Sequence, residues 1–183
     1  SRLHACYPDH NLVVRNLAWS ADTVILRPRP KDFGDIHHYL NESKADVILA
    51  SYGFNETWDY GGDEGIDRFG ADLAAFLKEL QTNNYNGTSA PKIVLYSPLA
   101  CEGTTVPDSL ERNRLLLLYT KTMQRVAGSL GIPCVDLFSA SQKMYQQDKE
   151  TSHTINGIHL TAEGYVKLAP AILTDRLFAP LPD

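Results

Sequence analysis

The sequence predicts an α/β protein in which a parallel sheet is covered by helices on both faces, a three-layer α/β/α sandwich. Three observations predict this class. Continuous apolar runs of strand length recur along the chain, and helix-length segments with one apolar face lie between them. The chain of 183 residues is also long enough to bury one sizeable core. We therefore expect a single domain over residues 1–183.

Four segments are expected to form strands. They are residues 11–17 (NLVVRNL), 45–51 (ADVILAS), 92–98 (KIVLYSP) and 132–138 (IPCVDLF). The runs are apolar throughout rather than alternating, which is typical of strands that are buried on both faces of a parallel sheet.

Five helices are expected between and after these strands, over residues 33–43, 63–82, 108–130, 139–148 and from Thr161 onward. Asp63 is a candidate N-cap, Pro107-Asp108 starts the third helix, Gly131 ends it, and Pro170 is a candidate kink in the last. The residues expected on apolar faces are Ile66, Phe69, Leu73, Phe76, Leu77 and Leu80; Leu110, Leu115, Leu118, Met123, Val126 and Leu130; and Val166, Leu168, Ile172 and Leu177.

Composition excludes several classes of partner. The net charge is −5 with no concentrated basic patch, which disfavours a nucleic-acid partner. No apolar run has the ~20 residues that a membrane-spanning helix needs. Three well-separated cysteines form no metal or redox motif, and His37-His38 point apart on a helix, so no metal site is expected. A soluble protein is expected; its compartment, with secreted and periplasmic locations among the options, and its oligomeric state are left open.

Polar groups follow the expected strands, where ligands bind in parallel α/β sheets. The backbone N–H groups around Ser20-Ala21, the amide of Asn55 and the imidazole of His159 all lie in such loops. Two hydrogen-bond donors directed at one point form an oxyanion hole, and a histidine beside them serves as a general base. This combination indicates acyl transfer.

These loops resemble the sequence blocks of the SGNH/GDSL hydrolases. NLAWSADT at 16–23 is similar to the block Asn-x-Gly-x-Ser-Gly-Asp-Thr, GFNE at 53–56 to Gly-x-Asn-Asp/Glu, and NGIHLTAEGY at 156–165 to Asp-Gly-x-His-Leu. The resemblance covers nearly the whole chain, in the right order, and looks closest to GDSL-like domains of planctomycete-type bacterial proteins. It implies a flavodoxin-like sheet and a serine esterase or acylhydrolase that needs no cofactor.

The resemblance also implies roles for individual residues. His159 takes the place of the base and Asn55 that of an oxyanion donor. Ala21 stands where the family has a glycine whose N–H also donates, a tolerable change if the backbone angle does not require glycine. Asn156 stands where the family has the aspartate that orients the base. Ser20, Glu56 and Trp58 are the residues expected at the substrate, with an ordinary loop role as the alternative for Glu56 and Trp58 and a bracing role for Asn55.

Two features depart from the family pattern. The Gly-Asp-Ser segment that carries the nucleophile, together with the first central strand of the sheet, is not found, so we expect an N-terminally incomplete domain. Asn156 carries no charge, and Asp148 or Glu150 are candidates to replace the carboxylate. Ser20, Ser51 and Cys101 are alternative nucleophiles, each more simply explained as structural.

The leading hypothesis is an enzyme that cleaves esters, with acyl groups on carbohydrate or another small-molecule ester as substrate. The alternative is a catalytically impaired module of the same fold that binds carbohydrate or another ligand. A nucleotide or flavin binder is disfavoured, because no glycine-rich phosphate loop follows any expected strand.

Overall fold

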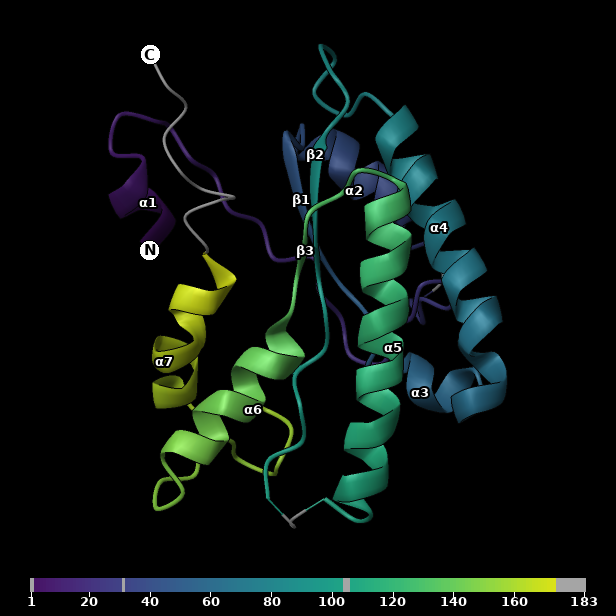
Figure 1. The fold of residues 1–183 in the computed structure, drawn as a ribbon. Helices are drawn as coiled ribbons and strands as arrows, with labels where there is room; N and C mark the ends of the chain where they lie inside the picture. The colour runs from purple at the N-terminus through teal and green to yellow at the C-terminus, as the bar shows by residue number, and fades with distance from the viewer. Residues whose placement is uncertain (1, 31, 104–105, 174–183) are drawn as a thin grey trace.

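The computed structural model describes residues 2–30, 32–103 and 106–173 (Figure 1). In chain order its elements are α1 (Arg2–Cys6), α2 (Ile36–Glu42), β1 (Val47–Ser51), α3 (Glu56–Asp59), the 3₁₀ helix η1 (Gly62–Gly65), α4 (Ile66–Thr82), β2 (Lys92–Tyr96), α5 (Ser109–Ser129), β3 (Cys134–Val135), α6 (Leu137–Gln147) and α7 (Ala162–Ile172).

The sheet within the described residues has three parallel strands in the order β1-β2-β3. Leu49 of β1 lies opposite Val94 of β2, and Leu95 of β2 lies opposite Cys134 of β3. The strands expected over 45–51 and 92–98 are confirmed. The strand expected over 132–138 is shorter than predicted, because α6 already begins at Leu137.

Helices cover the two faces of the sheet, which confirms the α/β architecture. In Figure 1, α4 and α5 lie on one side of the strands and α6 and α7 on the other. Alternate residues of β2 serve both sides, as the pleat of a strand requires: Ile93 and Leu95 belong to the core under α4 and α5, while Val94 and Tyr96 pack toward α7.

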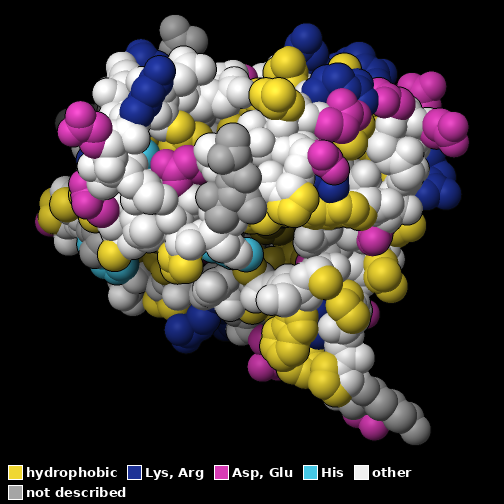
Figure 2. Space-filling model, turned by 90° about the horizontal axis from the view of Figure 1, so that it is seen from below, with side chains coloured by type: hydrophobic (Ala, Val, Ile, Leu, Met, Phe, Trp, Pro, Cys, Tyr) yellow, Lys and Arg dark blue, Asp and Glu magenta, His cyan; other side chains and the backbone are white. Residues whose placement is uncertain are grey.

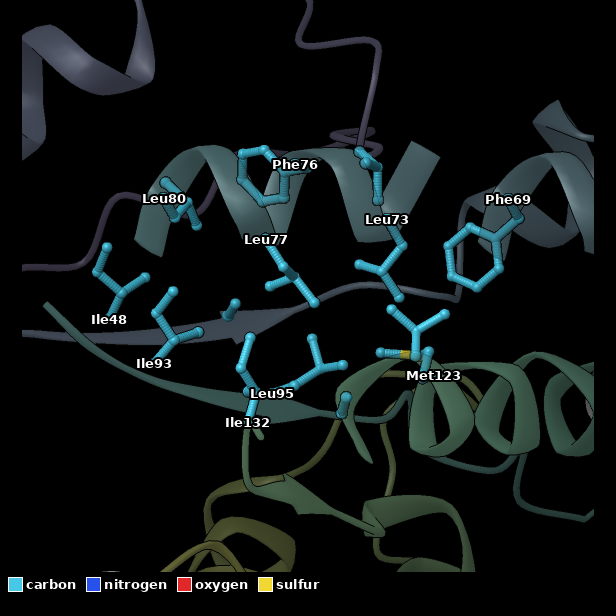
Figure 3. Close-up of a cluster of buried hydrophobic side chains, with 14 of the residues drawn as sticks. Ile48, Phe69, Leu73, Phe76, Leu77, Leu80, Ile93, Leu95, Met123 and Ile132 are labelled. Carbon is cyan, nitrogen blue, oxygen red and sulfur yellow. The ribbon is translucent and has the colours of Figure 1, made fainter. Parts of the chain in front are cut away.

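The larger core lies between α4, α5 and the sheet. Figure 3 shows side chains of α4 over Ile48 of β1 and over Ile93 and Leu95 of β2. The apolar stripe expected on α4 is confirmed, since the residues buried on this helix include Phe69, Leu73, Phe76, Leu77 and Leu80.

The face of β1 that points away from α4 is only partly covered in the described part of the chain. Val47 and Leu49 are 48% and 44% exposed, whereas Ile48 and Ala50, which point toward α4, are buried. Among the described residues β1 has only β2 as a hydrogen-bonded neighbour. This open edge agrees with the expected lack of a central strand.

The prediction of a strand over residues 11–17 is wrong. The segment has no regular secondary structure, and Val13 and Val14 are 63% and 58% exposed. A strand is stable only when its backbone groups pair with a neighbour. Within the described residues this segment pairs with none of the three strands, so its apolar sequence alone does not make it a strand.

Several helix details also differ from prediction. Asp63 does not cap α4: it lies in η1 and forms an ion pair with Arg114, and Gly65 precedes α4. Leu110 and Val166 are 88% and 72% exposed, so they lie off the buried faces of α5 and α7. Leu177, which is predicted to lie on the apolar face of the last helix, is outside the described residues. None of the described helices combines the length and the apolar character needed to cross a membrane.

Helix ends follow the predicted chemistry elsewhere. Thr161 caps α7, with its hydroxyl accepting a hydrogen bond from the Gly164 N–H at 3.0 Å. Gly131 follows α5 with a φ of +66°, the left-handed conformation that ends many helices. His37 and His38 have different neighbours, because His37 contacts Tyr85 and Glu79 while the His38 ring packs on Tyr39.

We predict that Leu77→Ala destabilises the protein by about 2–5 kcal/mol, because Leu77 is completely buried and its truncation leaves a cavity. Leu110→Ala is the matched control, since it removes the same atoms from an exposed helical position and should change stability by less than about 0.5 kcal/mol. Urea unfolding of both variants measures the difference. Equal losses would contradict the assignment of the core.

Candidate active site

The loops that follow the three strands lie at one end of the molecule, because the strands are parallel (Figure 1). Residues 52–55 and α3 follow β1, residues 97–106 follow β2, and α6 follows β3. Figure 2 looks onto this end and shows a hollow bordered by hydrophobic side chains, with a histidine near its edge. The residues singled out in the sequence come from these loops, from the turn at residues 19–22 and from the segment that precedes α7.

Asn55 directs its side chain away from its own helix. It precedes α3, makes no capping hydrogen bond, and donates from Nδ2 to the carbonyl oxygen of Asp22 at 2.9 Å. Its amide therefore connects the loop after β1 to the 19–22 turn rather than bracing its own loop. An amide nitrogen carries two hydrogens, so the second remains able to donate to a ligand beside that turn.

Ala21 occupies a strained backbone conformation. Its φ is +64°, in the left-handed region that costs a residue with a Cβ atom roughly 1–2 kcal/mol. The backbone angle is thus one that favours glycine. The next residue is held firmly, because Arg29 binds both carboxylate oxygens of Asp22 at 2.5 and 2.6 Å and stacks over Trp19. Ser20 is exposed on the same turn.

Glu56 lies inside the protein, with 1% of its surface exposed. One carboxylate oxygen accepts the Gly53 N–H at 2.7 Å and the other accepts the Val24 N–H at 3.0 Å. Burial raises the pKa of Glu56, and the backbone hydrogen bonds act in the opposite direction. In this structure the side chain holds two loops together and does not line the surface.

His159 is oriented by Asn156. The Nδ1 atom of the exposed ring lies 3.1 Å from the Asn156 Oδ1 atom, and the same oxygen accepts the backbone N–H of His159 at 3.0 Å. An amide oxygen can only accept, so this contact is a hydrogen bond when Nδ1 carries the proton. The Nε2 atom is then left with its lone pair, as a general base requires.

Glu102 anchors the segment that carries His159, and the sequence reasoning missed it. Its carboxylate accepts the backbone N–H groups of His153 and Thr154 at 2.9 and 2.7 Å and the Thr154 hydroxyl at 2.5 Å. Its own N–H donates to the Gly157 carbonyl at 2.8 Å. A single glutamate in a loop has no periodicity or motif, so nothing in the sequence indicated this role.

The anchored segment also approaches the loop after β2 closely. A Cβ atom added to Gly157, whose φ is +80°, would lie 2.6 Å from the side chain of Val106 and 3.2 Å from the Glu102 carbonyl oxygen. Only glycine therefore fits between Asn156 and Ile158. The turn before His159 therefore lies directly against Glu102 and Val106.

One small apolar cluster joins the two halves of the site. It consists of Ala100, Cys101, Leu116 and Phe138. Phe54, the residue before Asn55, packs against this cluster, and so does Ile158, the residue before His159. Asn55 and His159, more than 100 residues apart in the sequence, therefore follow side chains that share one packing site. The half-exposed Trp58 lies next to this cluster, because its ring makes an edge contact with Phe54.

The alternative site residues are placed elsewhere. Cys101 is 4% exposed, and burial raises the pKa of its thiol, which disfavours a thiolate nucleophile. Among the described residues, Asn156 is the hydrogen-bond partner of the His159 ring, and no serine takes that place. Asp148 pairs with Lys167 and lies 3.9 Å from His153, so it does not replace the missing carboxylate.

The described ranges contain no group of three His, Cys, Asp or Glu side chains with the arrangement of a metal site.

Comparisons with known proteins show the family of the chain and relatives of its fold. The family model of the GDSL-like lipase/acylhydrolases matches residues 1–167. The structure is similar to that of Axe2, an acetylxylan esterase from Geobacillus stearothermophilus, with 20% identity and a TM-score of 0.68 over 98% of this chain and 78% of that one. A lipase/acylhydrolase from Enterococcus faecalis is 21% identical, with a TM-score of 0.50 over 72% of this chain and 60% of that one. Among curated proteins, none matches the sequence significantly.

We predict that Glu102→Gln destabilises the protein by about 1–3 kcal/mol at neutral pH, because an amide cannot accept all the hydrogen bonds that the carboxylate accepts. Burial raises the pKa of Glu102, but the hydrogen bonds from Thr154 and His153 lower it by more, so the pKa lies below its usual value.

A group with a lowered folded-state pKa stabilises the protein above its unfolded pKa, and this contribution is lost as the pH falls through the folded value. The stability difference between the wild type and Glu102→Gln should therefore shrink in acid. Glu150→Gln, an exposed change in the same segment, is the control and should show little effect at any pH. Urea unfolding across pH tests this, and a pH-independent difference would contradict it.

Proposed function

The chain belongs to the GDSL-like lipase/acylhydrolase family, and we propose that it provides the general base and the oxyanion donors of a serine esterase. The substrate class that we propose is a small ester, with acyl groups on carbohydrate as the favoured case. Residues 1–183 act as one domain in this proposal.

The observation that supports the proposal best is the shared packing of Phe54 and Ile158 on one apolar cluster. It supports a common site for Asn55 and His159. The contact between Asn156 and His159 adds a histidine with one ring nitrogen engaged and the other able to accept a proton. The contact between Asn55 and Asp22 adds an amide donor beside the Ala21 turn.

The nucleophile in this proposal is a serine at the carboxyl end of a further parallel strand beside β1. The unpaired edge of β1 and the exposed side chains of Val47 and Leu49 support such a strand, because both features are unfavourable in water. A serine placed there would lie at the same end of the sheet as Asn55 and His159.

The reaction then proceeds by acyl transfer. His159 Nε2 removes the proton from the serine hydroxyl as the oxygen attacks the ester carbonyl. The second Asn55 Nδ2 hydrogen and the Ala21 N–H bind the negative oxygen of the tetrahedral intermediate. The imidazolium of His159 gives its proton to the departing alcohol, and a water molecule activated by the same histidine then releases the acid.

Asn156 limits the rate of this reaction. It orients His159 as an aspartate would, but it contributes no charge to stabilise the imidazolium that forms during attack. In a serine protease, a comparable replacement of aspartate by asparagine lowers kcat by about 10⁴-fold through the wrong imidazole tautomer. Here Asn156 Oδ1 accepts from Nδ1, so the loss that we propose is the smaller one that follows from the missing charge alone. We therefore propose a slow esterase.

Carbohydrate is favoured as the alcohol part for two reasons. The structurally similar Axe2 is an acetylxylan esterase. Trp58 and Ser20 are exposed in the segments that flank Asn55, where they are able to contact a sugar ring. Glu56 supports the site from inside, through the backbone of Gly53 and Val24.

A second candidate function is a module that binds an acylated carbohydrate without cleaving it. The uncharged Asn156 favours this function. Binding of a xylooligosaccharide that survives His159→Ala, together with no cleavage of any ester by the wild type, would support it.

We predict that the full-length protein hydrolyses a short-chain aryl acetate and that His159→Ala lowers kcat/KM by about 10²–10⁴-fold, because the general base is lost. His38→Ala is the matched control: this exposed histidine is on α2, which precedes β1, and its loss should leave the rate unchanged. Release of the chromophore measures both rates. No turnover by the wild type on any ester would refute the esterase.

We predict that Asn156→Asp raises kcat by at least about tenfold, since a carboxylate both orients the imidazole and stabilises its cation. Asn156→Ala should lower kcat below the wild-type value, because it removes the contact to Nδ1. Steady-state kinetics of the three proteins on one aryl acetate test the ranking. Equal rates for all three would show that Asn156 does not act on the base.

A further inference from the structure

Arg112 is placed beside the proposed site without a counter-charge. Its guanidinium carbon lies 3.7 Å from the centroid of the Trp58 ring, and its Nη1 donates to the Thr57 hydroxyl at 2.7 Å. The neighbouring residue Glu111 pairs instead with Arg114, which also binds Asp63. Among the described residues, none offers Arg112 a carboxylate within ion-pair distance.

This isolation is unfavourable for a partly buried cation. Burial lowers the pKa of Arg112, with only weak compensation from Cys101 and Glu111. An arginine nevertheless keeps its charge at any physiological pH. The Nη1 atom is used by Thr57, so the edge formed by Nε and Nη2 remains able to bind two oxygens of one planar anion.

Trp58 and Arg112 lie next to segments that carry the proposed active-site residues Asn55 and His159. Trp58 lies in the four-residue helix α3, three residues after Asn55, and its ring packs on Phe54, the residue before Asn55. Arg112 belongs to the first turn of α5, directly after residues 106–111, which line a shallow hollow. Val106 at the start of that hollow contacts the Gly157 turn before His159.

We propose that Trp58 and Arg112 form a subsite for a sugar that carries a carboxylate, so that the preferred substrate is an ester of an acidic saccharide. This inference rests on the proposed esterase function and specifies its substrate. The half-exposed indole provides an apolar surface for the sugar ring, and the free guanidinium edge binds the carboxylate. One arginine in a protein with a net charge of −5 suits a monoanion better than a polyanion.

The experiment compares two substrates that differ in one group. They are a mono-acetylated methyl glucuronoside and the matching mono-acetylated methyl glucoside, each assayed for acetate release by the full-length wild type, Arg112→Met and Arg125→Met. Arg125 is an exposed arginine on the same helix and serves as the control. An aryl acetate without a sugar reports the basal activity, and thermal unfolding reports whether each variant is folded.

We expect the wild type and Arg125→Met to prefer the glucuronoside by about tenfold in kcat/KM, which corresponds to ~1.4 kcal/mol. In Arg112→Met this preference should disappear, so that the two sugar esters are cleaved at equal rates relative to the aryl acetate. Equal rates of the wild type on both sugars, or a preference that persists in Arg112→Met, would overturn the subsite.

A binding measurement separates failure of the subsite from failure of the esterase. Calorimetric titration with unacetylated methyl glucuronoside requires no turnover. Binding by the wild type that is lost in Arg112→Met supports the subsite even if no ester is cleaved. Absence of binding by the wild type, or tighter binding of methyl glucoside 6-phosphate than of the glucuronoside, would overturn the carboxylate assignment.

Discussion

The parallel pairing of β1, β2 and β3 is the constraint on which the rest of the molecule depends. Because the strands run in one direction, the loops after β1 and β2 leave from the same end of the sheet, and the candidate site lies there. β2 is the central strand, and its alternating side chains take part in both cores, Ile93 and Leu95 on one face and Val94 and Tyr96 on the other. The position of the site is therefore a consequence of hydrophobic packing around a single strand.

Two carboxylates convert this arrangement into a defined site. Glu56 accepts the backbone N–H groups of Gly53 and Val24, and Glu102 accepts those of His153 and Thr154. Loop N–H groups need partners when they leave water, and an ionised acceptor binds them about twice as strongly as a neutral one. Each glutamate thus fixes a loop that carries a proposed active-site residue while remaining away from the ligand itself.

Charge is also what distinguishes the two sides of the proposed site. On the side of the general base, Asn156 is neutral where a carboxylate would stabilise the imidazolium of His159, and this favours slow turnover. The substrate side has the cationic Arg112, which forms no ion pair within the described residues, and this favours an anionic ligand. A bound carboxylate would supply the counter-charge that Arg112 lacks. Selectivity for an acidic sugar and modest turnover are compatible properties of one site.

The sequence by itself determined the α/β class, the strands at 45–51 and 92–98, the buried face of α4 and the start of the last helix near Thr161, because periodicity and helix-start signals are local properties. Its motifs also indicated Asn55, Ala21 and His159 as candidate active-site residues. Only the tertiary structure decided that residues 11–17 form no strand, since pairing depends on a neighbour that no local pattern contains. Likewise, the roles of Glu102, Glu56 and Arg112 depend on contacts across 51, 32 and 55 positions in the sequence. Such contacts exist only once the packed sheet brings those segments together.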